Sequence, residues 1–350
     1  VGITGSSGKT TTKELTAAIV GQRYPVFRNY GNYNDRYGLP IALGRLTPEH
    51  QVAVLELACD SMDEIRELAT LTRPQIGVVT TINETHLAYL GSLEAIAVEK
   101  GRLVEALPPA AEGGVAILNY DDPRVRAMAA RTRARVVTYG LAPDADLVAG
   151  AVEAGPEGTS FTVFVKDFFP VPGLRGKRKL RVQMSLLGQH HVYAALAAVA
   201  VGLTLGVSLD EALSALAAAQ PLPGRLNPLP GIHKTVILDD SFSASRETVA
   251  AFEQAHQVTL QFLKAGDAGA ALNQAILSKS NPMADVFFGV DNTYLSRALK
   301  ADIFQPYASP LLAAVPDHLK LDPQNRLLPV DFGDVCLNYD KKWFETRQLT

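Results

Sequence analysis

The chain has 350 residues, of which 47% are hydrophobic and 20% are charged. This composition predicts two folded domains, or one large α/β domain, with a sizeable buried core, and it argues against extensive disorder. The formal net charge of -3 gives no electrostatic reason to expect binding to nucleic acid or to an anionic membrane, so we expect neither partner.

The chain carries two cysteines, Cys59 and Cys336. They are too few for a disulfide framework or a cysteine-type zinc site, which fits the reducing cytoplasm. The Ala-rich run from Tyr193 to Val207 is shorter than the ~20 apolar residues of a membrane span, so it is interpreted as a buried helix. We therefore expect a cytoplasmic monomer without a signal peptide or a membrane segment.

The first expected element is a short apolar strand, Val1–Thr4, which leads into the glycine-bearing loop Gly5–Gly8 and a helix from Lys9 to about Val20. Strand, small-residue loop and helix in this order are the context of a phosphate-binding loop, because backbone N–H groups and the helix N-terminus converge on phosphate oxygens. In such a loop Lys9 reaches the terminal phosphates, and the hydroxyl of the next residue is placed to bind Mg²⁺. The order of the elements disfavours the alternative, a glycine-rich turn that contains Gly-Lys by chance.

Apolar strand-like runs then alternate with helical patterns. The expected strands are Val52–Leu57, Ile76–Thr80, Val115–Leu118 and Val136–Tyr139, and the expected helices are Ser61–Thr70, Leu93–Leu107 and Pro123–Thr132. Alternation at this spacing predicts a mostly parallel sheet with helices on both faces.

The pattern changes after Asp144. Residues 147–165 alternate apolar and polar side chains around two glycines, which predicts an antiparallel hairpin, and the basic run Arg175–Arg181 is interpreted as a solvated loop. The elements expected next are a strand at Val182–Leu187, helices at Val192–Gly206 and Leu209–Ala219, and a strand at Val236–Leu238. The predicted fold class is α/β, with a mostly parallel sheet that carries the phosphate loop and a small antiparallel insert.

The composition shifts again at about Asp240. Helices are expected at Arg246–Gln257 and Ala268–Lys279, and strands at Val286–Val290 and near Val335–Tyr339. We therefore predict two domains, residues 1–240 and residues 241–350, of which the second is a partial α/β lobe.

Several short motifs follow one another in order across the first 240 residues. They are Thr4-Gly5-Ser6-Ser7-Gly8-Lys9-Thr10-Thr11, Asn32-Tyr33-Asn34-Asp35 with Gly38-Leu39-Pro40, Leu55-Glu56-Leu57, Thr85-His86-Leu87, Glu99-Lys100-Gly101, Asn119-Tyr120-Asp121-Asp122-Pro123, Gly188-Gln189-His190-His191-Val192, Pro223-Gly224-Arg225 and Leu238-Asp239-Asp240-Ser241. Together they resemble the central, ATP-binding domain of the Mur ligase family. The pair Lys13-Glu14 is most similar to the branch that adds D-alanyl-D-alanine to a UDP-muramoyl-tripeptide.

This resemblance implies an ATP-dependent amide ligase of peptidoglycan precursor synthesis. Such a ligase phosphorylates the carboxylate of a UDP-muramoyl-peptide, and the amine of D-Ala-D-Ala then attacks the acyl phosphate. ATP and Mg²⁺ are the implied cofactors. The phosphoryl step depends on positioning and charge neutralisation rather than on a protein nucleophile.

The resemblance also assigns roles to single residues. The expected catalytic residues are Lys9, His86 and Lys100, of which Lys100 would carry a carbamate that bridges to a second Mg²⁺. The expected metal ligands are Thr10, Glu56, His86 and Lys100. The expected nucleotide-binding residues are Gly5, Ser6, Ser7, Gly8, Lys9, Thr10, Thr11, Asn34, His190, Arg225 and Asp240. Taken singly, Glu56 would be interpreted as a solvated surface group, His86 as a satisfied loop histidine and Lys100 as an exposed lysine, and only their order after the phosphate loop favours a site.

Three positions depart from the family pattern. Asp35 stands where a second asparagine is usual, His191 stands where the family has the asparagine that contacts adenine, and Tyr193-Ala194 replaces a pair that usually contains asparagine. The phosphate end of the expected site is therefore intact, whereas the base and substrate sides match the family less well.

Residues 240–345 resemble instead the first lobe of a periplasmic solute-binding protein of the thiamine or iron ABC-transporter type. The residues that carry this resemblance are Asp240–Ser245, Phe252-Glu253, Ala284–Asn292, Pro329–Gly333 and Leu337–Asp340. The chain is interpreted as a chimera joined near Asp239–Ser245, with a cut N-terminus and without the UDP-sugar and amine-binding domains of the ligases. We therefore expect it to bind Mg-ATP weakly and to ligate nothing.

Three alternatives stay open. The C-terminal third could be a divergent ligase domain, or it could carry the function as a solute-binding module, although one lobe leaves no cleft for tight ligand binding. The phosphate loop could also belong to a generic ATPase, against which the series Glu56, His86 and Lys100 argues.

Overall fold

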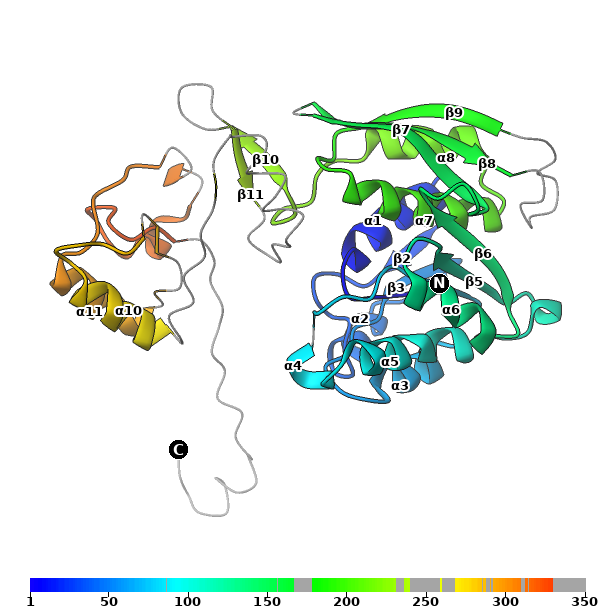
Figure 1. Cartoon of the computed structure of the whole chain (residues 1–350), viewed down its shortest axis with the longest axis horizontal. Coiled ribbons are helices and arrows are strands. Elements are labelled where there is room, and N and C mark those ends of the chain that lie inside the picture. The colour runs from blue at the N-terminus through cyan, green and yellow to red at the C-terminus, as the bar shows by residue number, and fades with distance from the viewer. Residues whose placement is uncertain are drawn as a thin grey trace, which may run out of the picture. The chain divides into compact units, whose positions relative to one another are not determined.

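The computed structural model describes residues 1–85, 87–155, 157–166, 178–230, 236–239, 259, 268–284, 286–287, 290, 292–309, 312–313 and 315–329. The chain divides into two compact units, Val1–Pro228 with Leu238–His256, and Leu229–Ile237 with Gln257–Thr350. The first unit contains the phosphate loop and the large sheet (Figure 1).

Within the described part of the first unit, nine strands form one sheet in the order β2-β3-β1-β4-β5-β6-β7-β8-β9. They are β1 (Gly2–Thr4), β2 (Val26–Arg28), β3 (Val52–Glu56), β4 (Ile76–Val79), β5 (Val115–Asn119), β6 (Arg135–Gly140), β7 (Leu147–Gly155), β8 (Gly158–Val165) and β9 (Arg178–Met184). All pairings from β2 to β7 are parallel, and β8 and β9 extend the sheet antiparallel. The predicted mostly parallel sheet with an antiparallel insert is confirmed.

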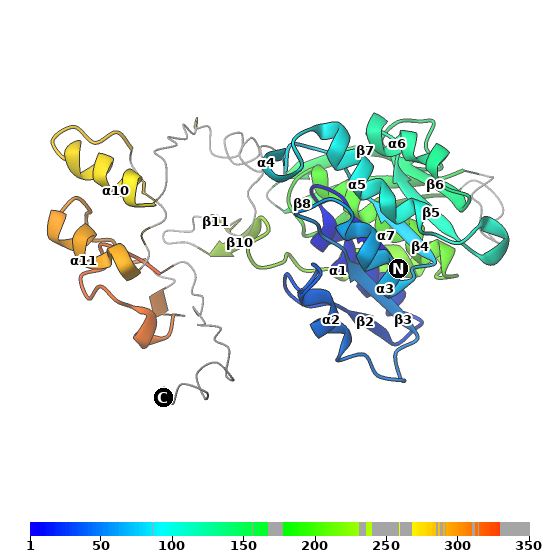
Figure 2. The same ribbon diagram turned by 90° about the horizontal axis from the view of Figure 1, so that it is seen from below.

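Helices cover both faces of this sheet (Figures 1 and 2). The helices of the first unit are α1 (Lys9–Val20), α2 (Gly38–Leu43), α3 (Glu64–Thr72), α4 (Leu87–Leu90), α5 (Leu93–Glu105), α6 (Pro123–Ala127), α7 (His190–Thr204) and α8 (Leu209–Ala218), with the short 3₁₀ turns η1 (Ala110–Glu112) and η2 (Met128–Arg131). Neighbouring strand residues face opposite layers. Val78 and Ile117 pack with α1 and α7, whereas Val79 and Leu118 pack with α3 and α5.

This layering sends the loops that follow β1 and β3 to opposite faces at the same carboxyl edge of the sheet. The two strands are parallel neighbours, and Ile3 lies opposite Glu56. The chain leaves β1 for α1 on one face of the sheet, and it leaves β3 for α3 on the other face. Loops that leave adjacent parallel strands toward opposite faces separate, and ligands of α/β proteins bind in the gap between them.

The Ala-rich run after Tyr193 forms most of α7, as expected, and this helix is buried over nearly its whole length. Gly202 allows the close approach of α1, because a side chain at this position would collide with Ile19. Of the helices that the structure describes, none combines the length and the apolar character of a membrane span.

Two predictions of local structure are wrong. The basic run Arg175–Arg181 was expected to be a loop, but its described residues 178–181 belong to β9, in which Leu180 and Val182 face inward and Lys179 and Arg181 face solvent. The expected strand at 286–290 is not formed by its described residues, and Val286 is 84% exposed. A short apolar run without a partner strand does not form a sheet.

The remaining described residues form few regular elements. β10 (Asn227–Pro230) and β11 (Val236–Asp239) pair as a two-stranded sheet. The second unit also contains α10 (Ala268–Leu277), α11 (Asn292–Ala301) and the 3₁₀ turn η5 (Asp317–Leu319). The helix expected at 268–279 is therefore confirmed. The helix expected at 246–257 and the strand expected near 335–339 lie outside the described residues.

Candidate functional site

The phosphate loop passes from β1 to α1 through two glycines with positive φ, 141° at Gly5 and 81° at Gly8. A side chain at Gly5 would collide with Thr80 at the end of β4, so the close approach of loop and strand requires glycine. Thr80 Oγ1 donates a hydrogen bond to the carbonyl oxygen of Ser7 at 2.6 Å. The loop is thus fixed against the sheet and places its small residues at the N-terminus of a 12-residue helix, which favours an anion.

The residues that follow β4 also hold the loop. Ser6 N donates to Thr81 O at 2.7 Å. Asn83 N donates to Ser6 Oγ at 3.1 Å, and Asn83 Nδ2 donates to Ser7 Oγ at 2.8 Å. Both predicted loop serines therefore have fixed side chains, and their partners come from the neighbouring strand end.

Lys9 lies at the first position of α1 and folds back over the loop. Its Nζ donates to the carbonyl oxygens of Gly5 at 2.9 Å and Ser6 at 3.2 Å. Burial, and after it the positive charge of Lys100, lowers the pKa of Lys9 to about 8, although the Glu56 carboxylate opposes the shift. Lys9, Lys100 and Glu56, three predicted site residues from different elements, therefore form one electrostatic cluster.

Glu56 has a carboxylate oxygen with no hydrogen-bond partner. Glu56 is only 3% exposed. Its Oε1 accepts a hydrogen bond from Asn34 Nδ2 at 2.7 Å, whereas its Oε2 is buried and has no hydrogen-bond partner. A buried, unpaired anionic oxygen is costly, and a cation beside it would remove that cost. Glu56 therefore fits the predicted role of a metal ligand.

The second predicted Mg²⁺ ligand, Thr10, lies in the first turn of α1. Its Oγ1 accepts a hydrogen bond from Arg225 Nη2 at 3.0 Å. Within the described residues, no group of three or more His, Cys, Asp or Glu side chains could hold a metal. Mg²⁺ binds through one or two protein oxygens and retains several waters or phosphate oxygens, so the hydroxyl of Thr10 and the carboxylate of Glu56 suit it chemically.

Lys100 is fully buried on α5, so the interpretation as a solvated lysine is wrong for this residue. Its Nζ donates to Cys59 Sγ at 3.4 Å. The adjacent Glu99 accepts bonds from Asp63 N at 2.7 Å and Ile65 N at 2.8 Å and so fixes the start of α3 against α5. Lys100 is thereby held beside the loop that follows Glu56.

The predicted base-side residues begin α7. The rings of His190 and His191 lie 4.1 Å apart between centroids. Burial lowers the pKa of His191 to about 3, so this ring is neutral at physiological pH. Tyr193, which departs from the family pattern, donates its hydroxyl to Asp121 Oδ2 at 2.9 Å and thereby connects α7 to the loop after β5.

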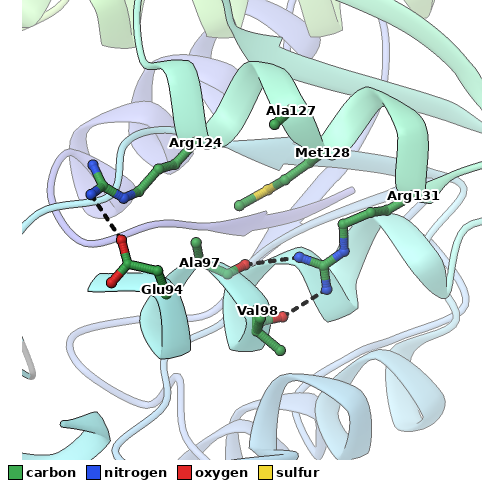
Figure 3. A pocket seen from close by; sticks show the side chains of 7 residues that line it. All are labelled: Glu94, Ala97, Val98, Arg124, Ala127, Met128 and Arg131. Carbon is green, nitrogen blue, oxygen red and sulfur yellow. Dashed lines mark hydrogen bonds and ion pairs between the residues drawn. The ribbon is translucent and has the colours of Figure 1, made fainter. Parts of the chain in front are cut away.

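A shallow surface hollow of about 290 Å³ lies between α5, α6 and η2 (Figure 3). Figure 3 shows the Arg131 guanidinium against the backbone of α5, where it donates to Ala97 O at 3.0 Å and Val98 O at 2.9 Å. A side chain at Gly101 would collide with this guanidinium. The hollow contains none of the predicted site residues, and its contacts fix the helix that carries Lys100.

The sequence of this chain matches a known protein family. The profile of the Mur ligase middle domain matches residues 3–202. The chain belongs to the Mur ligase family. It is 35% identical to the UDP-N-acetylmuramoyl-tripeptide--D-alanyl-D-alanine ligase of Escherichia coli over 257 residues, which are 73% of this chain and 54% of that ligase. The ligase of the same name from Bacillus subtilis is 32% identical over 253 residues, which are 72% of this chain and 51% of the relative.

Solved structures agree with this family assignment. Crystal structure I of MurF from Acinetobacter baumannii superposes with a TM-score of 0.66 at 27% identity, over 86% of this chain and 65% of that one. MurF from Thermotoga maritima in complex with ADP gives a TM-score of 0.62 at 26% identity, over 73% and 56%. The chain spans about half the length of the curated Mur ligases that it matches. These relatives lend no support to the expected resemblance of residues 240–345 to a solute-binding protein, which stays a prediction.

Two residues expected in the Mur ligase site, His86 and Asp240, lie outside the described residues. Sequence reasoning missed Asn29, Cys59 and Asn83, which contact Glu56, Lys100 and the loop serines, respectively. Their place in the sequence could have indicated them, because each lies shortly after a strand, and the carboxyl ends of these parallel strands meet at the same edge of the sheet.

Proposed function

We propose that this Mur ligase chain supplies the ATP-binding and carboxylate-activating centre of an ATP-dependent amide ligase of peptidoglycan precursor synthesis. The proposed carboxylate substrate is a UDP-muramoyl-peptide, and the proposed amine is D-Ala-D-Ala, as the names of the relatives suggest. One observation carries the proposal. Lys9, the partly unpaired carboxylate of Glu56 and the buried Lys100 form one cluster beside the phosphate loop.

The chain's own groups suit phosphoryl transfer to a carboxylate. The backbone of residues 5–8 and the start of α1 would bind the phosphates, and Lys9 would exchange its carbonyl partners for phosphate oxygens. Glu56 and Thr10 would hold Mg²⁺, which neutralises phosphate charge when bound. Arg225, already in contact with Thr10, would add positive charge on the same side.

Lys100 distinguishes a Mur ligase from a generic phosphate-loop ATPase in this proposal. A buried lysine amine that accepts CO₂ becomes a carbamate, which changes a cationic group into an anionic oxygen ligand beside the expected metal. The full burial of Lys100 and its contact with Cys59, in the loop that follows Glu56, favour this role.

Mass spectrometry of the intact chain in bicarbonate buffer tests the proposal. After an alkylating reagent traps the carbamate as its ester, we expect the mass of one CO₂ plus one alkyl group at Lys100, and no such addition at that position in Lys100→Arg. Lys320→Arg, a change in a lysine of the second unit, is the control and should keep the addition. An unmodified Lys100 in a chain that binds Mg-ATP would favour the generic ATPase instead.

A further inference from the structure

The carboxylate of Glu56 needs accurate placement if it is to offer one oxygen to a metal. Glu56 is the last residue of β3, and the regular pairing of β2 with β3 ends earlier, at Arg28 opposite Val54. The strand end that carries Glu56 is therefore not held by β2 through backbone hydrogen bonds of the sheet.

The side chain of Asn29 takes the place of the missing strand pairing. Glu56 N donates to Asn29 Oδ1 at 2.9 Å, and Asn29 Nδ2 donates to Glu56 O at 3.1 Å. The amide thus bonds both backbone groups of Glu56, as a neighbouring strand would. Asn29 is fully buried, so water does not compete for these bonds.

Asn29 also fixes the turn that brings Asn34 to the carboxylate. The same Nδ2 donates its second hydrogen to Tyr33 O at 2.9 Å. The next residue, Asn34, donates through Nδ2 to Glu56 Oε1 at 2.7 Å. One buried amide therefore controls both the backbone of Glu56 and the partner that occupies one of its two carboxylate oxygens. The other oxygen, Oε2, stays unpaired.

Lys13 ties this arrangement to the phosphate-loop helix. Lys13 lies on α1, is 1% exposed, and donates through Nζ to Asn29 O at 2.6 Å. Its charge is balanced by Glu14 at 3.1 Å, which also pairs with Arg28 at 2.8 Å. A buried ammonium with few partners is tolerated only in a fixed geometry, so the spacing between the loop and the strand end is set here.

We propose that Asn29 is a positioning residue for the metal ligand Glu56. Asn29 acts through Glu56 and does not touch the nucleotide. The inference rests on the proposed function, because it assumes that Glu56 binds the metal of a metal–nucleotide complex.

Calorimetric titration of the full chain with ADP, in EDTA and in Mn²⁺, tests the proposal. The readout is the metal-dependent gain, the ratio of the ADP affinity in Mn²⁺ to that in EDTA. We expect Asn29→Ala to reduce this gain by about 10–100-fold, as loss of a residue that orients a metal ligand does, and to leave the affinity in EDTA nearly unchanged. An undiminished gain in Asn29→Ala would refute the positioning role.

A double-mutant cycle separates positioning from general destabilisation. If Asn29 acts through Glu56, Asn29→Ala in the Glu56→Gln background should lower the gain no further. Independent, multiplying losses would contradict the proposal. Asp146→Ala is the matched control, because it removes two hydrogen bonds from Thr138 N at 2.8 Å and Thr138 Oγ1 at 2.7 Å between β6 and β7. It should lower the melting temperature and keep the gain.

The outcomes separate this inference from the proposed function. A wild-type chain without a metal-dependent gain overturns both. A wild-type gain that Asn29→Ala retains overturns the inference alone. If Asn29→Ala does not fold, Asn29→Ser, which keeps one donor and one acceptor, is titrated instead, and the same loss of gain is required of it.

Discussion

Lys9 joins two opposing requirements in one side chain. It needs a positive charge to bind phosphate, and yet its surroundings favour the neutral amine, because burial and Lys100 lower its pKa to about 8. The carbonyl oxygens of Gly5 and Ser6 compensate in part by accepting its hydrogen bonds. A nucleotide phosphate beside Lys9 would restore the charged form, so phosphate binding and protonation are coupled.

This coupling predicts that nucleotide affinity depends on pH. Below about pH 8 Lys9 is protonated before binding. Above that pH the free chain must take up a proton on binding, so the affinity for Mg-ADP should fall by up to about tenfold per pH unit. Calorimetry from pH 7 to pH 9.5, in buffers of different ionisation heat, measures the affinity for Mg-ADP and the number of protons taken up on binding. Lys9→Arg keeps its charge throughout and should show no such fall, and a fall of equal size in Lys9→Arg would assign it to another group.

The site residues differ in how far the sequence could predict them. Lys9 and Thr10 were predicted from a phosphate loop between a strand and a helix, and the structure has that order of elements, whereas the role of Glu56 was predicted only from the resemblance to the Mur ligases. The metal-ligand role of Glu56 gains support from its unpaired oxygen. The position of Asn29 after a strand gave a signal for the edge of the sheet, but its contacts with Glu56 were not predictable, because they depend on where the pairing of β2 with β3 stops.

For the basic run before Val182, the charge of the residues predicted a loop, whereas their alternation predicts a strand. Arg175–Arg181 contains so many basic residues that a loop was predicted, with a strand only from Val182. The strand β9 begins at Arg178 instead, and its inward Leu180, Val182 and Met184 alternate with solvent-facing residues. The alternation was the better signal, because side-chain direction in a strand has a period of two. The helix after the phosphate loop was predicted with the bounds it has, since Gly8 in the left-handed region defines its start.

The contact of α1 with α7 makes a prediction about stability. Gly202→Ala places a methyl group against Ile19 in the core, so the free energy of unfolding should fall by about 1–3 kcal/mol. Chemical denaturation followed by circular dichroism measures the change. Gly155→Ala serves as the control, because a side chain there would meet no atom within 4 Å. Equal stability of Gly202→Ala and wild type would show that the helices separate without cost.

At the scale of the whole molecule, every described residue of the candidate site belongs to the first unit. A chain that ends after residue 256, the end of that unit, should therefore bind Mg-ADP within about twofold of the full chain, because a compact unit with its own core can fold alone. Parallel titration of the two chains measures the ratio. A loss of binding in the shorter chain, provided that it melts cooperatively, would show that residues beyond 256 contribute to the site.

The division of the chain was only partly predictable. A boundary near residue 240 followed from a shift in composition, and the compact units divide between residues 228 and 238 and again after residue 256. Among the described residues, β10 and β11 pair with each other as a separate two-stranded sheet, although β11 has the apolar sequence of a strand in a large sheet. Pairing partners are set by tertiary structure, which composition does not report.

Titration of Mg-ATP into wild type and Lys9→Ala shows whether the phosphate loop of this Mur ligase chain binds nucleotide. Lys166→Ala, which removes another lysine of the first unit that bonds a carbonyl oxygen, is the control. We predict saturable binding by wild type and Lys166→Ala and its loss in Lys9→Ala. Equal binding by Lys9→Ala and wild type, or no binding by a folded wild-type chain, would contradict the account.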